Sequence, residues 1–565
     1  METASQPAPP AAWRLVFSAM RYHTRMPGGA STPVTRAAVL SLLVLLLAYA
    51  VMGALLAWVL TTSDYEIEYL VLGTLAVKGE IGLYQDELTG QWVPLPFFVY
   101  GLSQLVAGPS LLGARLLSLL IGAVVLVLVW SLARRWAGPV AGAAAGALLV
   151  TQGLVTGYLV MVDYSGLAAL IHVLGIFVLF ATRWRGRTFI AMAIFSVLFL
   201  VKPNYWPTVA LVFVYLAWQA ERWRTRAALF AIAIALPVVF FASSPTHLKL
   251  LAYVPVARNW VAPLGYHAWF SLIEDARALS ASEYFDATWG VTWLERLTQL
   301  GRSGLFLAKR YAAWLALLVL LSALTLPRRG RPAAASCWAA PGFRLTLALF
   351  WAVVLSQFVV LGPWSKQAIG YVGAIAPLFA LVLGVLAAEA LALPATSARL
   401  AAATALLLVL LASPWLHRHH NLPRRIVPAE AAIPEAARVA ARLRAAIPAG
   451  ERRVFLLADP LLIYLADRRA YLRQSHQHKW MFTTMRDAAR YRRSGVWGPA
   501  ELEDWLGGDA QYAVVESDVL EFYARRPLFR PVLARMQQLL TERFSLVDRV
   551  EMADGATLSV YRRRV

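Results

Sequence analysis

Long apolar runs, separated by short polar or basic segments, dominate this chain from residue 38 to residue 416. Most of them approach the roughly 17–25 residues that an α-helix needs to cross a bilayer. We expect eleven spans, at about 38–60, 112–133, 137–152, 165–181, 188–201, 206–220, 227–242, 304–326, 343–362, 371–393 and 399–416. The pattern predicts an α-helical polytopic membrane protein whose spans are unbroken apolar helices.

The composition supports a membrane protein and excludes a nucleic-acid-binding one. Apolar residues make up 59% of the 565 residues and charged residues only 15%, whereas soluble domains average roughly 45–50% apolar. The net charge of +21 comes from short basic clusters between apolar runs, with no basic stripe interleaved with aromatic residues. Such clusters are typical of loops that face anionic lipids. We therefore expect membrane lipids as partners and no nucleic acid.

The same clusters predict the orientation. If the spans alternate, most of the clusters fall on one side, together with the N-terminal tail, residues 1–37. By the positive-inside rule, that side is the cytoplasm. We expect a multi-pass protein of the cell (inner) membrane with a cytoplasmic N-terminus. Because eleven is odd, the segment after residue 416 should be extracytoplasmic.

Two connecting segments on the predicted outer side, residues 61–111 and 242–303, are unusually long. Loops of this length are uncommon unless they are functional or disordered. The first is rich in glycine, proline and aromatic residues and carries several acids, and the second holds four tryptophans. We assign both to a transmembrane domain, residues 38–416. The single cysteine, Cys337, excludes an internal disulfide and a cysteine-pair metal site.

After residue 416 the composition becomes that of a soluble domain. An amphipathic helix is expected at 429–446, strands at 453–458 and 512–515, and a short helix at 460–466. Residues 544–552 and 557–561 predict a hairpin around Asp554-Gly555, a strong turn signal. Residues 417–565 should therefore form a small extracytoplasmic α/β domain.

Charged residues stand at the outer ends of several spans. Asp64, Glu66 and Glu68 follow the first span, Asp163 lies between the third and fourth, and Lys202 ends the fifth. A carboxylate can accept the proton of an attacking hydroxyl, and a cation can stabilise a departing phosphate. The set suits transfer from a lipid phosphate. Simpler interpretations stay open: solvated loop acids, a helix N-cap at Asp163 and a lysine that reaches out to the interface.

The chain resembles the GT-C superfamily of membrane glycosyltransferases that use polyprenyl-phosphate sugars. The similar branches include protein O-mannosyltransferases, lipid A aminoarabinose transferases and rhizobial lipid A galacturonosyl transferases. The resemblance covers roughly residues 40–420. It rests on an ordered set of stretches: Asp64 with Glu66, Lys78–Tyr84 with Pro94–Phe97, Gly113–Ser118, Asp163, Lys202-Pro203 and Tyr371–Pro377.

This resemblance implies a GT-C catalytic domain at 38–416 and an inverting-type transfer of a sugar from a polyprenyl-phosphate carrier. The acceptor would be an envelope lipid, polysaccharide or protein at the outer face of the membrane. Asp64 would be the catalytic base or would position the acceptor, with Glu66 and Asp163 in the same site. The implied residues that bind the donor phosphate are Lys202, Arg115, Arg258 and Lys78.

The chain departs from the family pattern at two places. Tyr65 separates Asp64 from Glu66, where the family often has adjacent acids, so the acid with the second role is uncertain. The aminoarabinose branch has a lysine before its two prolines, whereas Val93 precedes Pro94 here. That difference argues against aminoarabinose and leaves the sugar open.

A divalent metal is the one candidate cofactor, because some superfamily members bind one near these carboxylates. Asp64 and Asp163, with Glu66, could supply oxygen ligands, and His247 and His267 are weaker candidates.

Three other functions compete with glycosyl transfer. A transporter or flippase of lipid-linked substrates should show repeats and broken helices with binding groups near the middle of the membrane, and neither is evident. A protein that only binds an envelope partner would not account for Asp64, Asp163 and Lys202 on one side. An O-antigen ligase or polymerase usually has a basic outer loop, but residues 242–303 are mixed in charge.

Overall fold

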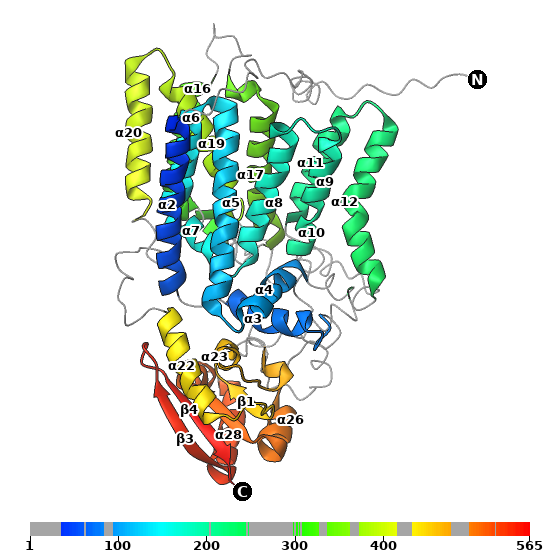
Figure 1. Ribbon diagram of the computed structural model, residues 1–565, viewed down its shortest axis with the longest axis vertical. Coiled ribbons are helices and arrows are strands. Elements are labelled where there is room, and N and C mark those ends of the chain that lie inside the picture. Colours follow the sequence, from blue (N-terminus) through cyan, green and yellow to red (C-terminus); the bar gives the residue numbers. More distant parts are fainter. Residues whose placement is uncertain are drawn as a thin grey trace, which may run out of the picture.

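The computed structural model describes most of the transmembrane bundle and of the C-terminal region. The described residues are 36–60, 64–83, 94–202, 205–244, 247, 298, 301–302, 304–305, 308–326, 336–361, 372–414, 432–475, 497–525 and 527–564. Apolar helices run side by side in the bundle, and a mixed α/β region lies beyond one end of it (Figure 1).

The helices of the bundle follow the predicted apolar runs. They are α2 (Arg36–Val59), α5 (Leu111–Ala137), α6 (Pro139–Thr151), α7 (Gly153–Val160), α8 (Tyr164–Ala181), α9 (Arg187–Ser196), α10 (Leu198–Val201), α11 (Trp206–Gln219), α12 (Trp223–Ser243), α16 (Ala312–Thr325), α17 (Pro341–Leu361), α19 (Ala376–Leu391) and α20 (Thr396–Ala412). Nearly every residue of α19 is buried, as expected for a helix that is apolar all round. In contrast, α2 exposes most of its apolar side chains.

The predicted count of eleven spans stays a prediction. Among the described residues, four helices are long and apolar enough to cross a membrane, namely α2, α5, α8 and α12. A fifth span is formed if α6 and α7 count as one. Most of the remaining runs form apolar helices of 10–17 residues.

The expectation of an unbroken span holds for α6, which matches the predicted span 137–152, but the chain bends sharply directly after this helix. Helices α6 and α7 are bent by 75° at Gln152. The fifth run is also divided, at Val197, into α9 and α10. Because α7 and α10 end there, backbone and polar side chains lie at the edge of the bundle. Asp163 follows α7 at this edge, and Lys202 follows α10.

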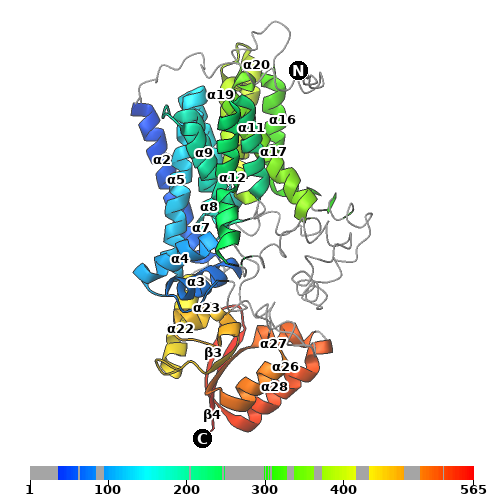
Figure 2. The same ribbon diagram turned by 90° about the vertical axis from the view of Figure 1, so that its right-hand side faces the viewer.

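The segment 61–111 is not a plain loop. It contains two helices, α3 (Asp64–Val77) and α4 (Pro94–Ala107), which lie across the end of the bundle next to the C-terminal region (Figure 2). They cross where two glycines meet: a Cβ on Gly101 would lie 2.2 Å from the carbonyl oxygen of Gly73. This close approach fixes how α3 presents its acids to the bundle.

The C-terminal region contains a four-stranded sheet in the order β1-β2-β4-β3. Strand β1 (Val454–Leu457) pairs parallel with β2 (Tyr512–Glu516), and β4 (Thr557–Arg563) pairs antiparallel with β2 and with β3 (Phe544–Glu551). These strands coincide with the predicted ones. The limits of the domains, at 37/38 and 416/417, and the side of the membrane that the sheet faces stay predictions.

Helices cover both faces of this sheet. Alternate residues of β1 point to opposite faces, as the pleat requires. Val454 and Leu456 pack with α22 (Ala432–Ala446) and α23 (Pro460–Leu465), in a core that is continuous with the transmembrane bundle. Phe455 and Leu457 pack on the other face, with α26 (Pro499–Leu502), α27 (Ser517–Ala524) and α28 (Arg530–Arg543).

Polar contacts join α23 and the loop after it to α3 and α4. The Tyr464 hydroxyl lies 2.8 Å from the Thr74 hydroxyl and donates to Gln104 Oε1 at 3.3 Å. Arg469 donates two hydrogen bonds to the Glu80 carboxylate, one of them 2.7 Å long. The C-terminal region is therefore held against the two crossing helices.

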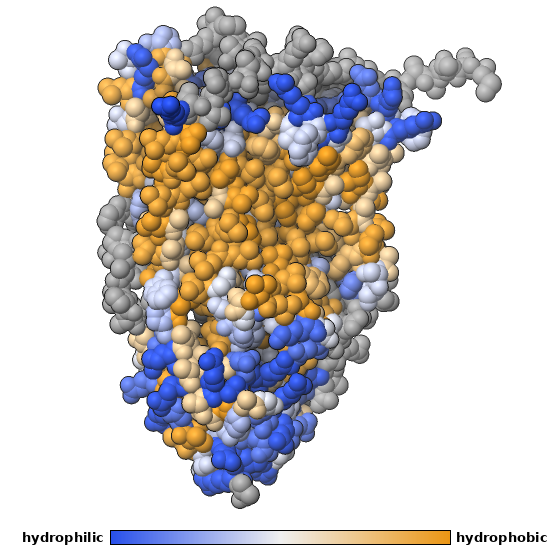
Figure 3. All heavy atoms as spheres, viewed as in Figure 1, coloured by the Kyte–Doolittle hydropathy of each residue, from blue (hydrophilic) through white to orange (hydrophobic). Residues whose placement is uncertain are grey.

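On the face shown in Figure 3, an apolar band covers the bundle, and hydrophilic residues lie above and below it. The ends of the helices opposite to the sheet carry the described basic clusters: Arg134, Arg135, Arg183, Arg185, Arg187, Arg222, Arg224, Arg226 and Arg399. This gathering is the arrangement on which the predicted orientation depends. Which compartment each end faces stays a prediction.

Replacing Gly101 with alanine should destabilise the crossing of α3 and α4, because the new methyl group would overlap the Gly73 backbone. We expect the free energy of unfolding to fall by about 1–3 kcal/mol, the usual range for overpacking. Thermal unfolding in detergent measures it. Gly166→Ala in α8 is the control, because its Cβ would meet only ordinary contacts at 3.7 Å. Equal stability of the two variants would contradict a tight crossing.

Candidate functional site

A buried ion pair lies where α2, α3 and α5 meet. Arg115 of α5 donates from Nε to Glu66 Oε1 at 2.8 Å and from Nη2 to Glu66 Oε2 at 2.7 Å, and both side chains are fully buried. Arg115 Nη1 also donates to the carbonyl oxygens of Ala57 and Leu60, at 2.7 and 2.8 Å. One guanidinium therefore satisfies a carboxylate and the carbonyl end of α2.

Glu66 extends this network to the turn between α7 and α8. The backbone N–H of Val162 donates to Glu66 Oε1 at 3.1 Å. Glu66 and Arg115 were predicted to act on the substrate and on the donor phosphate, and no observation tests those roles. Their contacts are those of groups that position the neighbouring residue, Asp163.

Asp163 is the N-cap of α8, as one of the sequence interpretations held. Its Oδ1 accepts from the Tyr164 N–H at 2.6 Å, and its Oδ2 accepts from the Ser165 hydroxyl at 3.1 Å. The Tyr100 hydroxyl of α4 donates to the Asp163 carbonyl oxygen at 3.0 Å. An N-cap carboxylate is favoured by the dipole of the helix that it begins. Asp163 is held at both its side chain and its backbone.

Lys202 lies beside Asp163. It is the C-cap of α10 and is 6% exposed, and its Nζ is 4.9 Å from the centre of the Tyr164 ring. Its charge interacts with those of Asp163 and Glu68. The structure thus brings together two of the predicted residues, which are 39 positions apart in the sequence, in a largely buried cluster of opposite charges.

Glu68 belongs to this cluster, although the sequence analysis named it among the outer acids without giving it a role in the site. It is 2% exposed. Positions 64 and 68 are one turn apart in α3, whereas position 66 is on another face, because helical residues repeat every 3.6 positions. The helical spacing was the signal. Asp64 begins α3, and its side chain lies outside the described part of the structure.

Arg310 is a second residue that the sequence reasoning missed. Its charge and that of Asp163 both act on Tyr158 of α7. The sequence feature that could have identified Arg310 is the pair Lys309-Arg310 inside the predicted span 304–326, because two charged side chains are costly to place within a membrane. Helix α16 begins only at Ala312, so Arg310 lies before the helix.

Four other predicted residues lie away from this cluster or outside the described part of the chain. Lys78 follows the far end of α3, about 18 Å along the helix axis from Glu66 at 1.5 Å per residue. Arg258 and His267 lie outside the described residues. His247 contacts the Phe240 carbonyl oxygen at 2.7 Å and stacks on its ring.

The metal prediction at Asp64 and Asp163 is not tested. Among the described residues, no three histidine, cysteine or acidic side chains are grouped as a metal site would require. Both Asp163 oxygens already accept hydrogen bonds, and the Asp64 side chain is not described.

Comparisons with known proteins show what the sequence and the fold of this chain resemble. Residues 92–243 match the family described as dolichyl-phosphate-mannose-protein mannosyltransferase. The fold is similar to that of ArnT from Cupriavidus metallidurans bound to undecaprenyl phosphate, at 14% identity over 92% of this chain and 97% of that one, with a TM-score of 0.52. The resemblance to the GT-C membrane glycosyltransferases is thereby confirmed.

The apo form of ArnT has the same fold, at 13% identity over 93% of this chain and 98% of that one, with a TM-score of 0.52. No curated protein matches the sequence. The segment that matches the family contains Arg115, Asp163 and Lys202. The acids of α3 precede that segment.

Replacing Arg115 with methionine should strongly destabilise the transmembrane bundle, because the Glu66 carboxylate would stay buried without its cation. We expect a loss of about 3–5 kcal/mol, as when one partner of a buried pair is removed. Thermal unfolding in detergent is the measurement, with the exposed Arg185 changed to methionine as the control. If the Arg115 variant were as stable as this control, the pair would not hold the helices together.

Proposed function

We propose that this protein transfers a sugar from a polyprenyl-phosphate carrier to an envelope acceptor at the outer face of the cell membrane. The transfer is a single displacement that inverts the anomeric centre. Three findings support the proposal: the GT-C fold, the match to a family of dolichyl-phosphate-mannose-dependent transferases, and the undecaprenyl phosphate bound by ArnT. The matched family and ArnT are both named for a polyprenyl-type phosphate, dolichyl phosphate in the family and undecaprenyl phosphate in the ArnT structure.

The observation that carries the proposal is the buried cluster of Asp163, Glu68 and Lys202 at the helix ends. Ionisable groups at a membrane boundary are expensive to bury and are therefore a default sign of function. The cluster combines the two charges that the transfer needs. It lies at the end of the bundle where the C-terminal sheet also lies (Figure 1).

Lys202 is proposed to bind the phosphate of the carrier. A lysine ammonium binds phosphate as a compact point charge. In the transfer, the bond between the sugar carbon and the phosphate oxygen breaks, and negative charge develops on the departing polyprenyl phosphate. A fixed cation stabilises that charge most when water is excluded, and Lys202 is almost fully buried. Arg310 provides a second cation nearby.

A carboxylate is proposed to take the proton of the acceptor hydroxyl as its oxygen attacks the sugar carbon. Asp64, at the first position of α3, is the proposed base, and Asp163 is the supporting carboxylate. Asp163 keeps a fixed position because its N-cap bonds and the Tyr100 contact hold it. Glu66 and Arg115 are proposed to position this carboxylate through the Val162 N–H.

The main rival is a transporter of lipid-linked substrates, and one observation bears on it. The bent pair α6 and α7 is a broken helix of the kind that transporters use. However, His172, an ionisable group inside the bundle, has both ring nitrogens engaged, with the Ala168 carbonyl oxygen and the Thr208 hydroxyl. The charge cluster lies at helix ends, which favours surface chemistry over passage through the bundle.

Removing either charge should abolish transfer while the fold is kept. Asp163→Asn retains an N-capping side chain, because asparagine caps as well as aspartate, and Lys202→Met retains the apolar stem. We expect each variant to lower the rate by about 100-fold or more, the usual effect of losing a catalytic group. The measurement is the turnover of labelled sugar from a polyprenyl-phosphate donor pool in membranes.

The matched controls remove the same charges elsewhere: Glu221→Gln and Lys309→Met, both on exposed residues. Their rates should equal that of the unchanged protein. Asp64→Asn is measured in the same series. It distinguishes the role of Asp64, the proposed base, from that of Asp163, the supporting carboxylate. Full transfer in the Asp163 and Lys202 variants at equal protein level would remove the cluster from the mechanism. Transfer in no protein, across several donors, would favour the transporter.

A further inference from the structure

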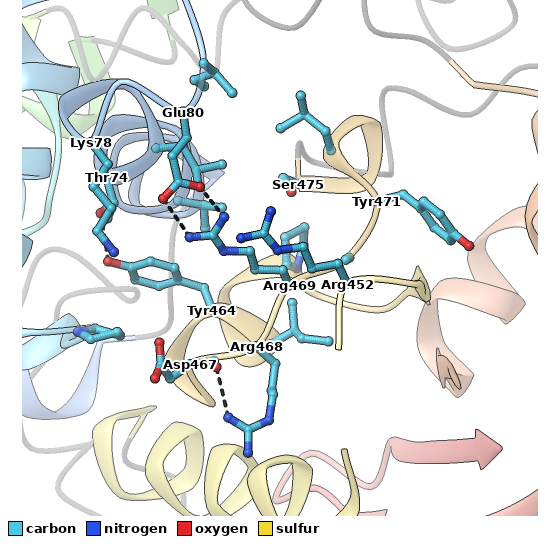
Figure 4. A pocket seen from close by; sticks show the side chains of 18 residues that line it. Thr74, Lys78, Glu80, Arg452, Tyr464, Asp467, Arg468, Arg469, Tyr471 and Ser475 are labelled. Atoms are coloured by element: carbon cyan, nitrogen blue, oxygen red, sulfur yellow. Dashed lines mark hydrogen bonds and ion pairs between the residues drawn. The ribbon is translucent and has the colours of Figure 1, made fainter. Parts of the chain in front are cut away.

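A cavity of about 330 Å³ lies between the membrane part of the chain and the C-terminal region. Its walls come from the second half of α3, from Pro109 after α4, and from α23 with the loop that follows it. Figure 4 shows Lys78 and Glu80 on one side and Arg452, Arg469 and Ser475 facing them. The cavity is separate from the Asp163 cluster, which α3 contacts near its first turn.

Cations outnumber acids in this cavity. Its wall carries four cations, Lys78, Arg452, Arg468 and Arg469, against two acids, Glu80 and Asp467. The hydrogen bonds from Arg469, with the nearby charges of Lys78 and Arg452, lower the pKa of Glu80 below its usual value. Glu80 therefore stays ionised and holds Arg469 against the wall.

Two of the cations are available to a ligand. Among the described residues, neither Lys78 nor Arg452 donates a side-chain hydrogen bond to the protein, and both are exposed. Arg468 is turned away, to the carbonyl oxygens of Ile447 and Arg444. The pocket thus presents a lysine from the α3 side and an arginine from the C-terminal side to the same space.

The exposed face of α4 indicates the level at which this cavity lies relative to the membrane. Phe98, Leu102, Leu105 and Val106 follow a helical spacing and are 43–92% exposed. A helix with such a face lies in the interface, with its apolar side in the boundary between headgroups and acyl chains. Pro109, two residues after α4, lines the cavity. The cavity therefore opens at the level of lipid headgroups.

We propose that this cavity binds the phosphate of an anionic phospholipid headgroup, through Lys78 and Arg452. Basic pockets at headgroup depth recognise lipid phosphates in this way, and arginine and lysine are the preferred phosphate ligands. The apolar part of the wall, with Leu75, Ile81 and Leu472, suits the glycerol and upper acyl portion of the lipid. The site is distinct from the transfer site and does not depend on the proposed transfer.

A bound headgroup would join the two parts of the chain, because Lys78 follows α3 and Arg452 precedes β1. The phosphate would add a charged link to the Glu80–Arg469 and Thr74–Tyr464 contacts. The lipid would act as a structural ligand that holds the C-terminal region against the crossing helices.

Binding of a short-chain fluorescent phosphatidylglycerol to the full chain in an uncharged detergent tests this proposal. Phosphatidylcholine and inorganic phosphate serve as competitors. We expect the double variant Lys78→Gln, Arg452→Gln to weaken binding by about 30-fold, since each cation near a lipid phosphate contributes about fivefold. Phosphatidylcholine should compete poorly, because its headgroup carries no net charge.

The matched control is Arg549→Gln, Arg562→Gln, which removes two exposed cations of the C-terminal sheet that do not line the cavity. Its affinity should equal that of the unchanged protein, and thermal unfolding checks that both double variants are folded. Equal binding by the cavity variant and the control would overturn the proposal. If millimolar inorganic phosphate displaced the lipid completely, the cavity would be a site for free phosphate and the assignment to a headgroup would be wrong.

Discussion

The buried pair of Glu66 and Arg115 is the interaction on which the site depends. Two fully buried charges are tolerated only when each is paired and further hydrogen-bonded, and the partners here come from different elements. Arg115 satisfies the carbonyl end of α2 as well as Glu66, and Glu66 accepts from the Val162 backbone. Consequently α3 cannot shift without leaving a buried charge or a helix end unsatisfied. The position of Asp163 follows from this constraint.

The membrane explains why the chemistry gathers at helix ends. A charge in the hydrocarbon costs several kcal/mol, but a cap position offers backbone partners and access to water. Asp163 uses the beginning of α8, and Lys202 follows the end of α10. The bend between α6 and α7 shortens the run that precedes Asp163. Broken helices therefore create the site, and they do so at the edge of the bundle rather than in its middle.

Sequence reasoning located most of the elements but few of the contacts. The apolar runs, the N-cap at Asp163 and the strands of the C-terminal sheet depend on local patterns, which a sequence displays. The Glu66–Arg115 pair joins residues 49 positions apart, and no local sequence pattern predicts this contact. The extents of helices α3 and α4 were not predicted, and residues 61–111 were described as a long connecting segment rich in glycine. Two of these glycines, Gly73 and Gly101, are required by the close crossing of the helices. Glu68 was given no role in the site, because the helix face on which it lies is defined only once α3 is known to be helical.

Helix α3 serves two separate systems of charge. Its first turns contribute Glu66 and Glu68 to the buried network, whereas Lys78 and Glu80, which follow its last turn, face the arginines of the C-terminal region. The first system is buried. The second is open and contains Lys78 and Arg452, whose side chains donate no hydrogen bond to the described part of the protein. A charge change at the open end would alter the docking of the C-terminal region and leave the Glu66–Arg115 contacts in place. Substitutions can therefore change the contacts at one end of α3 without changing those at the other end, even though both ends lie at the same surface of the membrane.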